Sequence, residues 1–162
     1  MKNIIKSISI FFMALFISIV VYPFLHELGH SIMAILLGVR IVEINLLPTP
    51  NILCENVGNE ITKELLIGSS GIILPIIISL SIRTKKFWGW YSNLILKCIC
   101  LLSVSISALA IIFQKSKLFL QDDMRIVLGL GDEGKIFCLI IILCMAVILS
   151  FNIYKEIHKR TT

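Results

Sequence analysis

The chain has 162 residues, of which 57% are apolar and only 15% are charged, whereas soluble domains carry about 25% charged residues. So few charges cannot cover a soluble globule, and the mean hydropathy of +0.97 indicates an integral membrane protein. The net charge of +5 comes from Lys and Arg residues scattered between apolar runs, which is typical of membrane-flanking loops and not of a nucleic-acid-binding face.

The first apolar segment, residues 8–38, predicts a long membrane helix that is interrupted at Pro23. Lys2 and Lys6 precede it, as in a signal peptide, but a small-residue cleavage site is missing, so an uncleaved anchor is favoured. A straight helix of this length would span about 47 Å at roughly 1.5 Å per residue, whereas the hydrocarbon core is about 30 Å thick. The segment is therefore either one long tilted helix kinked at Pro23, or a spanning helix followed by a partly inserted one.

Residues 39–60 change character and predict a short strand or hairpin at the membrane edge. Residues 39–46 alternate and are rich in β-branched side chains, and the turn formers Pro48, Pro50 and Gly58 follow. If this segment lies at membrane depth, it must be buried in protein, because unpaired backbone polar groups are costly in lipid.

Three further apolar segments complete the predicted set of spans, at residues 65–82, 94–113 and 135–154. Aromatic residues lie beside the basic loop that separates the first two of them, as is typical at a membrane interface. We therefore expect a single transmembrane domain over residues 1–162. Its fold class is all-α and polytopic, with about four transmembrane helices and a short β element after the first.

The motif His26-Glu27-Leu28-Gly29-His30 carries the chemistry of the first segment. On a helix, residues four apart share one face, so the two imidazoles can bind one zinc ion. Glu27 projects beside the metal, where it can take a proton from an activated water and deliver it to a leaving amine. Ionisable groups in an apolar helix are costly and usually functional. The structural alternative is that Glu27 pairs with one histidine across a helix interface.

Residues 20–46 resemble the first motif of the site-2-protease zinc metallopeptidases, in particular their compact branch, in which the HExxH helix is embedded in the bilayer. The resemblance lies in that motif, in the small residues around it and in the strand-like segment after it, namely Gly29, Ser31, Ala34, Gly38 and residues 40–46. It implies that His26 and His30 bind zinc and that Glu27 is the general base.

A catalytic zinc ion needs a third protein ligand and an open position for water. The family that this chain resembles generally uses an aspartate on a later segment, often in Leu-Asp-Gly, which this chain lacks. Asp122, Asp123 and Asp132 all lie on the membrane side where the HExxH helix ends. We favour Asp123, because residues 123–130 are similar to the compact branch, where an aspartate opens a short apolar helix that ends near glycine. The alternative is that these aspartates are ordinary helix N-caps, or in the case of Asp132 a loop residue.

Two groups of small polar residues lie in the second and third spans. Residues 68–71, Gly-Ser-Ser-Gly, provide small side chains for the close approach of two helices, and they resemble the small-residue segment beside the family's active site. Ser103, Ser105 and Ser107 are expected to hydrogen-bond to their own helix carbonyls, the alternative being that they line a polar cavity.

Together these features predict a zinc metalloendopeptidase of the HExxH type that hydrolyses a peptide bond within or next to the membrane. Glu27 is its expected catalytic residue, and His26, His30 and Asp123 are its expected metal ligands. The expected partners are a membrane-embedded or membrane-proximal protein or peptide and the lipid bilayer, and no nucleic acid. The expected location is multi-pass in the plasma membrane of a prokaryote. The alternatives are a membrane protein that binds zinc without proteolysis and a metal-free structural or transport-associated membrane protein.

Overall fold

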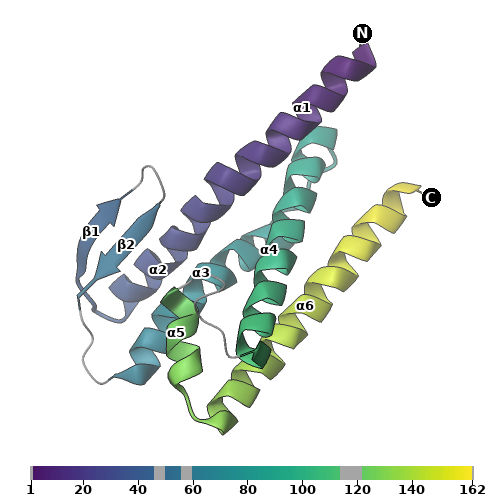
Figure 1. The fold of residues 1–162 in the computed structure, drawn as a ribbon. Helices are drawn as coiled ribbons and strands as arrows, with labels where there is room; N and C mark the ends of the chain where they lie inside the picture. The colour runs from purple at the N-terminus through teal and green to yellow at the C-terminus, as the bar shows by residue number, and fades with distance from the viewer. Residues whose placement is uncertain (1, 46–49, 56–59, 114–121, 162) are drawn as a thin grey trace.

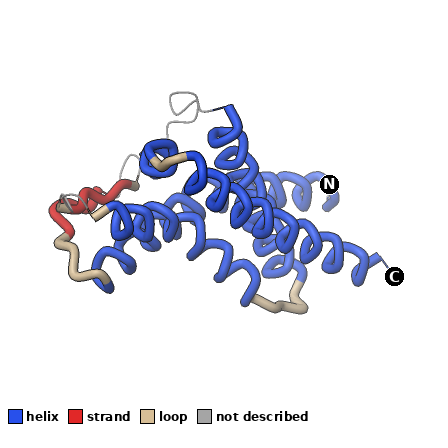
Figure 2. The backbone as a smooth tube through the Cα atoms, turned by 90° about the horizontal axis from the view of Figure 1, so that it is seen from below, coloured by secondary structure: helices blue, strands red, loops and turns tan. Residues whose placement is uncertain are grey.

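The computed structural model describes residues 2–45, 50–55, 60–113 and 122–161, which form a helical assembly with a small hairpin at one edge (Figures 1 and 2). Four of its helical segments are long and apolar enough to cross a membrane. The predicted class, a polytopic all-α membrane protein with a short β element, is therefore confirmed. In chain order the elements are α1 (Lys2–Phe16), η1 (Ile17–Val21), α2 (Tyr22–Leu36), β1 (Ile41–Asn45), β2 (Asn51–Cys54), α3 (Ile61–Ser81), α4 (Phe87–Phe113), α5 (Asp122–Gly129) and α6 (Asp132–Thr161).

The first span is one continuous helical rod made of α1, η1 and α2, as Figure 1 shows. Pro23 has no backbone N–H and cannot continue the ordinary hydrogen-bond ladder of an α-helix. The chain accommodates it with the π-helical turn η1 directly before α2, where the N–H of Tyr22 donates to the carbonyl of Ile17. The helix therefore continues past the proline, and its apolar part, Ile4–Leu36, is longer than the roughly 20 residues that a bilayer requires.

A glycine-based cap ends this rod and starts the hairpin. Gly38 has a φ of 70°, which a side chain would disfavour, and its N–H donates to the carbonyl of Ile35 at 3.1 Å. The N–H of Val39 reaches the carbonyl of Ala34 at 2.8 Å, which completes a Schellman motif. The turn leads into β1, which pairs antiparallel with β2. The predicted strand or hairpin is thus confirmed, and the hairpin lies beside α2 (Figure 1).

The core lies between α3, α4 and the parts of the rod and of α6 that touch them. Its buried apolar residues are Ile17, Ile76, Leu96, Cys100, Val104 and Leu149. Half of the most apolar stretch of α4 is buried, compared with 6% of the corresponding stretch in the rod and in α6. α4 is therefore central, and the other two are peripheral. Their many exposed apolar side chains suit contact with lipid tails rather than with water.

The helices extend beyond the apolar segments that predicted them, and α4 and α6 do so the most. α4 begins at Phe87 rather than near residue 94, and α6 continues to Thr161 rather than ending near residue 154. The extensions are stabilised by contacts that apolarity cannot reveal. The guanidinium of Arg160 lies 4.4 Å from the ring centre of Trp90 and donates to the carbonyl of Lys85 at 2.9 Å.

Because α4 begins early, Lys97 lies well inside the helix and not near its end. Its side chain is 1% exposed, and its ammonium donates to Asn152 Oδ1 at 2.7 Å and forms an ion pair with Glu156. A buried lysine is costly unless it is paired and hydrogen-bonded, and both partners come from α6. This cluster therefore fixes the position of α6 against α4.

We predict that Lys97→Met destabilises the fold by about 2–3 kcal/mol, because it leaves Glu156 without its cation. Breaking a fully buried ion pair costs about 3–5 kcal/mol, and the loss is smaller here because Glu156 is partly exposed. Thermal unfolding in detergent, followed by circular dichroism, measures the effect. The matched control, Lys97→Met combined with Glu156→Leu, should recover most of the loss. Additive losses in the double variant would contradict the pairing.

Candidate metal centre

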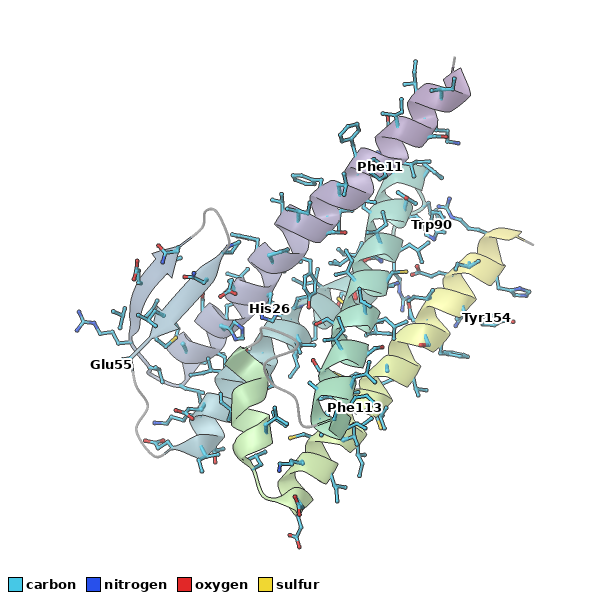
Figure 3. All side chains as sticks on the ribbon, in the orientation of Figure 1. Phe11, His26, Glu55, Trp90, Phe113 and Tyr154 are labelled. Carbon is cyan, nitrogen blue, oxygen red and sulfur yellow. The ribbon has the colours of Figure 1, made fainter. Side chains whose placement is uncertain are left out.

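His26 and His30 meet on one face of α2, one helical turn apart. Their Nε2 atoms are 3.1 Å apart, and the two rings are nearly perpendicular, with centroids separated by 4.6 Å. One carboxylate oxygen of Glu27 and one ring nitrogen of each histidine lie within 4.8 Å of one another. Figure 3 shows His26 in the interior of the assembly, near α3. The spacing of the motif thus brings three possible metal-site groups together.

The ring of His30 is oriented by the neighbouring helix α3. Its Nδ1 lies 2.7 Å from the carbonyl oxygen of Ile67, which also accepts a hydrogen bond from Ser70 Oγ. When Nδ1–H donates to that carbonyl, a neutral His30 presents the lone pair of Nε2 toward Nε2 of His26. Such a bond to a backbone carbonyl is the usual outer-shell contact of a metal-binding histidine, because it fixes both tautomer and ring orientation.

Two glycines allow α2 and α3 to approach closely at this point. A Cβ added to Gly29 would collide with the backbone carbonyl of Ser70, and one added to Gly71 would lie 2.5 Å from the imidazole of His30 and 2.8 Å from that of His26. Both imidazole rings therefore pack directly against Gly71. The predicted role of the Gly-Ser-Ser-Gly segment in helix approach is confirmed, and α2 with α3 forms the most extensive helix contact of the described residues.

The hairpin reaches the same region through β2. Burial, and then the negative charge of Glu27, raise the pKa of the Cys54 thiol above its ordinary value. This electrostatic effect indicates that Cys54 lies near Glu27, in agreement with the contact between β2 and α2. The thiol therefore stays neutral at physiological pH.

The donor set fits zinc. Two imidazole nitrogens bound to a tetrahedral zinc ion, each about 2.0–2.1 Å from it, lie about 3.3–3.4 Å apart, close to the separation found here. Gly71 has no side chain that would occupy the space of the two imidazoles. The hydrogen bond between His30 and the carbonyl of Ile67 orients the ring, as an outer-shell contact of a metal ligand does. His26 and His30 could therefore hold the ion, with Glu27 beside it.

The three aspartates lie at two different places. Asp132 opens α6, its side chain is 91% exposed, and it lies 3.7 Å from the ammonium of Lys135, as suits a residue at a helix N-terminus. Asp122 and Asp123 open α5, the predicted short helix that ends at a glycine, but their side chains lie outside those that the structure describes. α5 itself packs against α3, the helix that carries Gly71.

A model of the family described as Peptidase M50B-like matches residues 6–121, which is more than half of the chain. The chain belongs to this family. The M50 peptidases are zinc metalloproteases of membranes with transmembrane helices, so the resemblance found in the sequence is confirmed. The matched residues include the HExxH motif and α3 and end just before Asp122, so the match does not reach the candidate third ligands. No curated protein and no solved structure matches the chain.

Sequence reasoning did not find the carbonyl of Ile67 that orients His30, because a backbone oxygen has no signature in a sequence. The contact of Gly71 with both imidazoles was also beyond it. The Gly-Ser-Ser-Gly run signalled a close approach of helices but did not say which helix face it would meet. Only the pairing of α2 with α3 supplies that information.

We predict that Gly71→Ala abolishes zinc binding, because the added methyl group takes the space of the two imidazoles. Zinc content per chain, measured by elemental analysis of purified protein, should fall from about one to near zero. Gly129→Ala is the matched control, because a Cβ there meets nothing within 4 Å. Equal zinc content in Gly71→Ala and in wild type would show that the rings do not need this glycine.

Proposed function

We propose that this member of the family is an active zinc-dependent endopeptidase that cleaves a peptide bond within or next to the membrane. The observation that carries the proposal is the cluster of His26, Glu27 and His30 on a membrane helix, with both imidazoles facing each other over Gly71. In this proposal His26 and His30 are metal ligands, Asp123 is the third ligand and Glu27 is the catalytic base.

When bound, zinc supplies Lewis-acid chemistry, making water a competent nucleophile near neutral pH and polarising the scissile carbonyl. Glu27 accepts the proton of the attacking water and then delivers it to the leaving amine, so that one carboxylate serves both steps. His30, held by the carbonyl of Ile67, keeps its Nε2 directed into the site. Gly71 keeps side-chain atoms away from the two rings.

Asp123 is proposed as the third ligand from its place at the start of α5. That helix packs on α3, whose Gly71 and Ile67 contact the histidines, and it descends from the level of α2 to the start of α6 in Figure 1. Asp132, at the far end of this connection, is exposed and lies beside Lys135. An acid on α5 is therefore closer to the part of α3 that contacts the imidazoles than an acid at the start of α6 is.

The proposed substrate is a membrane-embedded or membrane-proximal polypeptide in extended form. A substrate helix must unwind locally before its amide can react, because the backbone of a membrane helix is fully hydrogen-bonded. The hairpin of β1 and β2 lies next to α2, and its outer edge offers backbone groups for pairing with an unwound segment. We place this activity in a single multi-pass domain in the plasma membrane of a prokaryote.

The proposal predicts that Glu27→Gln retains about one zinc ion per chain but loses peptidase activity by at least about 100-fold, because the base is removed and the ligands are kept. Activity is measured on a transmembrane model peptide reconstituted with the protein in the same liposomes. Glu55→Gln, an exposed acid of the hairpin end, is the control and should cleave normally.

The zinc content separates the remaining possibilities. A protein that binds zinc without proteolysis would retain its metal and show no cleavage even in wild type. A metal-free structural protein would contain far less than one zinc ion per chain, and His26→Ala would leave that content unchanged. Either result would reject the proposed function.

The choice of third ligand gives a separate prediction. Asp123→Asn should lower zinc affinity by at least about 100-fold, measured by competition with a chelator, because the loss of a ligand costs more than the loss of an outer-shell partner. Asp132→Asn is the matched control and should bind as wild type. If Asp122→Asn or Asp132→Asn shows the loss instead, that residue replaces Asp123 in the proposal.

A further inference from the structure

A polar cavity of about 580 Å³ lies at the end of the bundle where α3 ends, α4 begins and α6 ends. Its lining residues come from the connection between α3 and α4, from the first turns of α4 and from the last turns of α6. Ile82, which lines it, follows Gly71 by about 16 Å along α3 at roughly 1.5 Å per residue, so the cavity is separate from the metal centre. Figure 1 shows that both chain termini lie at this same end.

The lining carries a strong excess of positive charge. Its basic residues are Arg83, Lys85, Lys155, Lys159 and Arg160, and its single acid is Glu156. The ion pair with Lys97 already balances the charge of that acid. The basic side chains are exposed, whereas Trp90 and Asn152 are partly buried and Asn93 is buried. A ligand of this cavity must therefore be anionic.

Three buried polar atoms of the lining have no hydrogen-bond partner among the described residues. They are Nε1 of Trp90, Oδ1 of Asn93 and Oε2 of Glu156. The indole can only donate, and the carboxylate oxygen accepts; Asn93, which is 5% exposed, uses its Nδ2 to donate to the carbonyl of Ile82 and so presents Oδ1 as an acceptor. Buried polar groups are normally satisfied, so the cavity calls for a ligand with both acceptors and donors.

Aromatic residues near the cavity are of the kind found at the level of the lipid headgroups. Trp88 and Trp90 lie in the first turns of α4 and Tyr154 lies near the end of α6, as is typical of aromatic residues at a membrane interface. The basic lining is held in place, since Arg160 lies over the ring of Trp90 and donates to the carbonyl of Lys85. Figure 3 shows Trp90 at the end of α4 near the chain termini.

We propose that this cavity binds the headgroup of an anionic phospholipid that carries hydroxyl groups, as phosphatidylglycerol does. The phosphodiester accepts hydrogen bonds from the indole of Trp90 and from the basic side chains, and the headgroup hydroxyls donate to Asn93 and Glu156. A choline headgroup has a phosphate but offers no hydroxyl or N–H donor and no net negative charge, so it satisfies only part of the lining.

The test uses the whole protein in detergent with Trp88→Phe, which leaves Trp90 as the reporter, because the chain has two tryptophans. Short-chain phosphatidylglycerol, phosphatidylcholine with the same acyl chains, and inorganic phosphate are titrated separately. Phosphatidylglycerol should give a saturable change in Trp90 emission. Phosphatidylcholine should bind at least about tenfold more weakly, and millimolar inorganic phosphate should neither change the emission nor compete.

Two sets of variants distinguish a built site from general attraction of charges. Arg83→Gln with Lys159→Gln should weaken phosphatidylglycerol binding roughly 25-fold, at roughly fivefold per cation near a lipid surface. Arg40→Gln with Lys63→Gln removes the same charge elsewhere and should leave binding unchanged. Trp90→Phe changes no charge, yet it should reduce the lipid-dependent rise in melting temperature because the indole donor is lost.

Each of the opposite results overturns the proposal. Equal binding of both lipids, competition by inorganic phosphate, or equal weakening in the two double-charge variants would each show that no headgroup site exists here. Unchanged circular dichroism of the lipid-free variants serves as the folding check. Because lipid binding is read from Trp90 and the melting temperature, the test is independent of whether the protein cleaves peptides.

Discussion

The close approach of α2 and α3 is the constraint on which the rest of the site depends. Gly29 contacts the backbone of Ser70, and Gly71 contacts both imidazoles. Each helix therefore has a glycine at the point where the other helix comes closest. In lipid, helices gain no hydrophobic driving force from association, and close packing of small residues takes its place. The same packing brings the carbonyl of Ile67 within reach of His30, so association of the helices and orientation of the ligand are one event.

Lipid also dictates how the structure treats its polar groups. Each buried ionisable or hydrogen-bonding side chain in a span must find a partner inside the protein. Lys97 finds Asn152 and Glu156 on α6, whereas His30 finds the backbone of α3. Two of the three serines in α4 meet this need locally: Ser105 and Ser107 hydrogen-bond to carbonyls one turn earlier, as the sequence predicted. The prediction does not hold for Ser103, whose buried Oγ has no hydrogen-bond partner among the described residues. Long-range polar contacts are thus concentrated where two helices have to be held in a particular register.

The sequence predicted those features that depend on local pattern. Apolar length located the four spans, the spacing of His26 and His30 predicted their shared face, and the turn formers after residue 46 predicted a hairpin. It misjudged where helices end, because α4 and α6 extend through polar turns stabilised by partners distant in the chain, such as Arg160 and Trp90. The sequence also did not predict the π-helical turn before Pro23. A proline indicates that the hydrogen bonding of a helix is interrupted, but not which local geometry lets the helix continue.

The two polar regions lie toward opposite halves of the helices that connect them. α3 carries Gly71 of the metal centre and, at its far end, the carbonyl of Ile82 that holds Asn93 beside the basic cavity. α4 lies between, with half of its most apolar stretch buried, while the rod and α6 present apolar surfaces outward. The glycine contacts with α2 leave α3 little freedom to slide along its axis. Any such shift would disturb both regions at once, because the carbonyl of Ile67 contacts His30 and the carbonyl of Ile82 contacts Asn93.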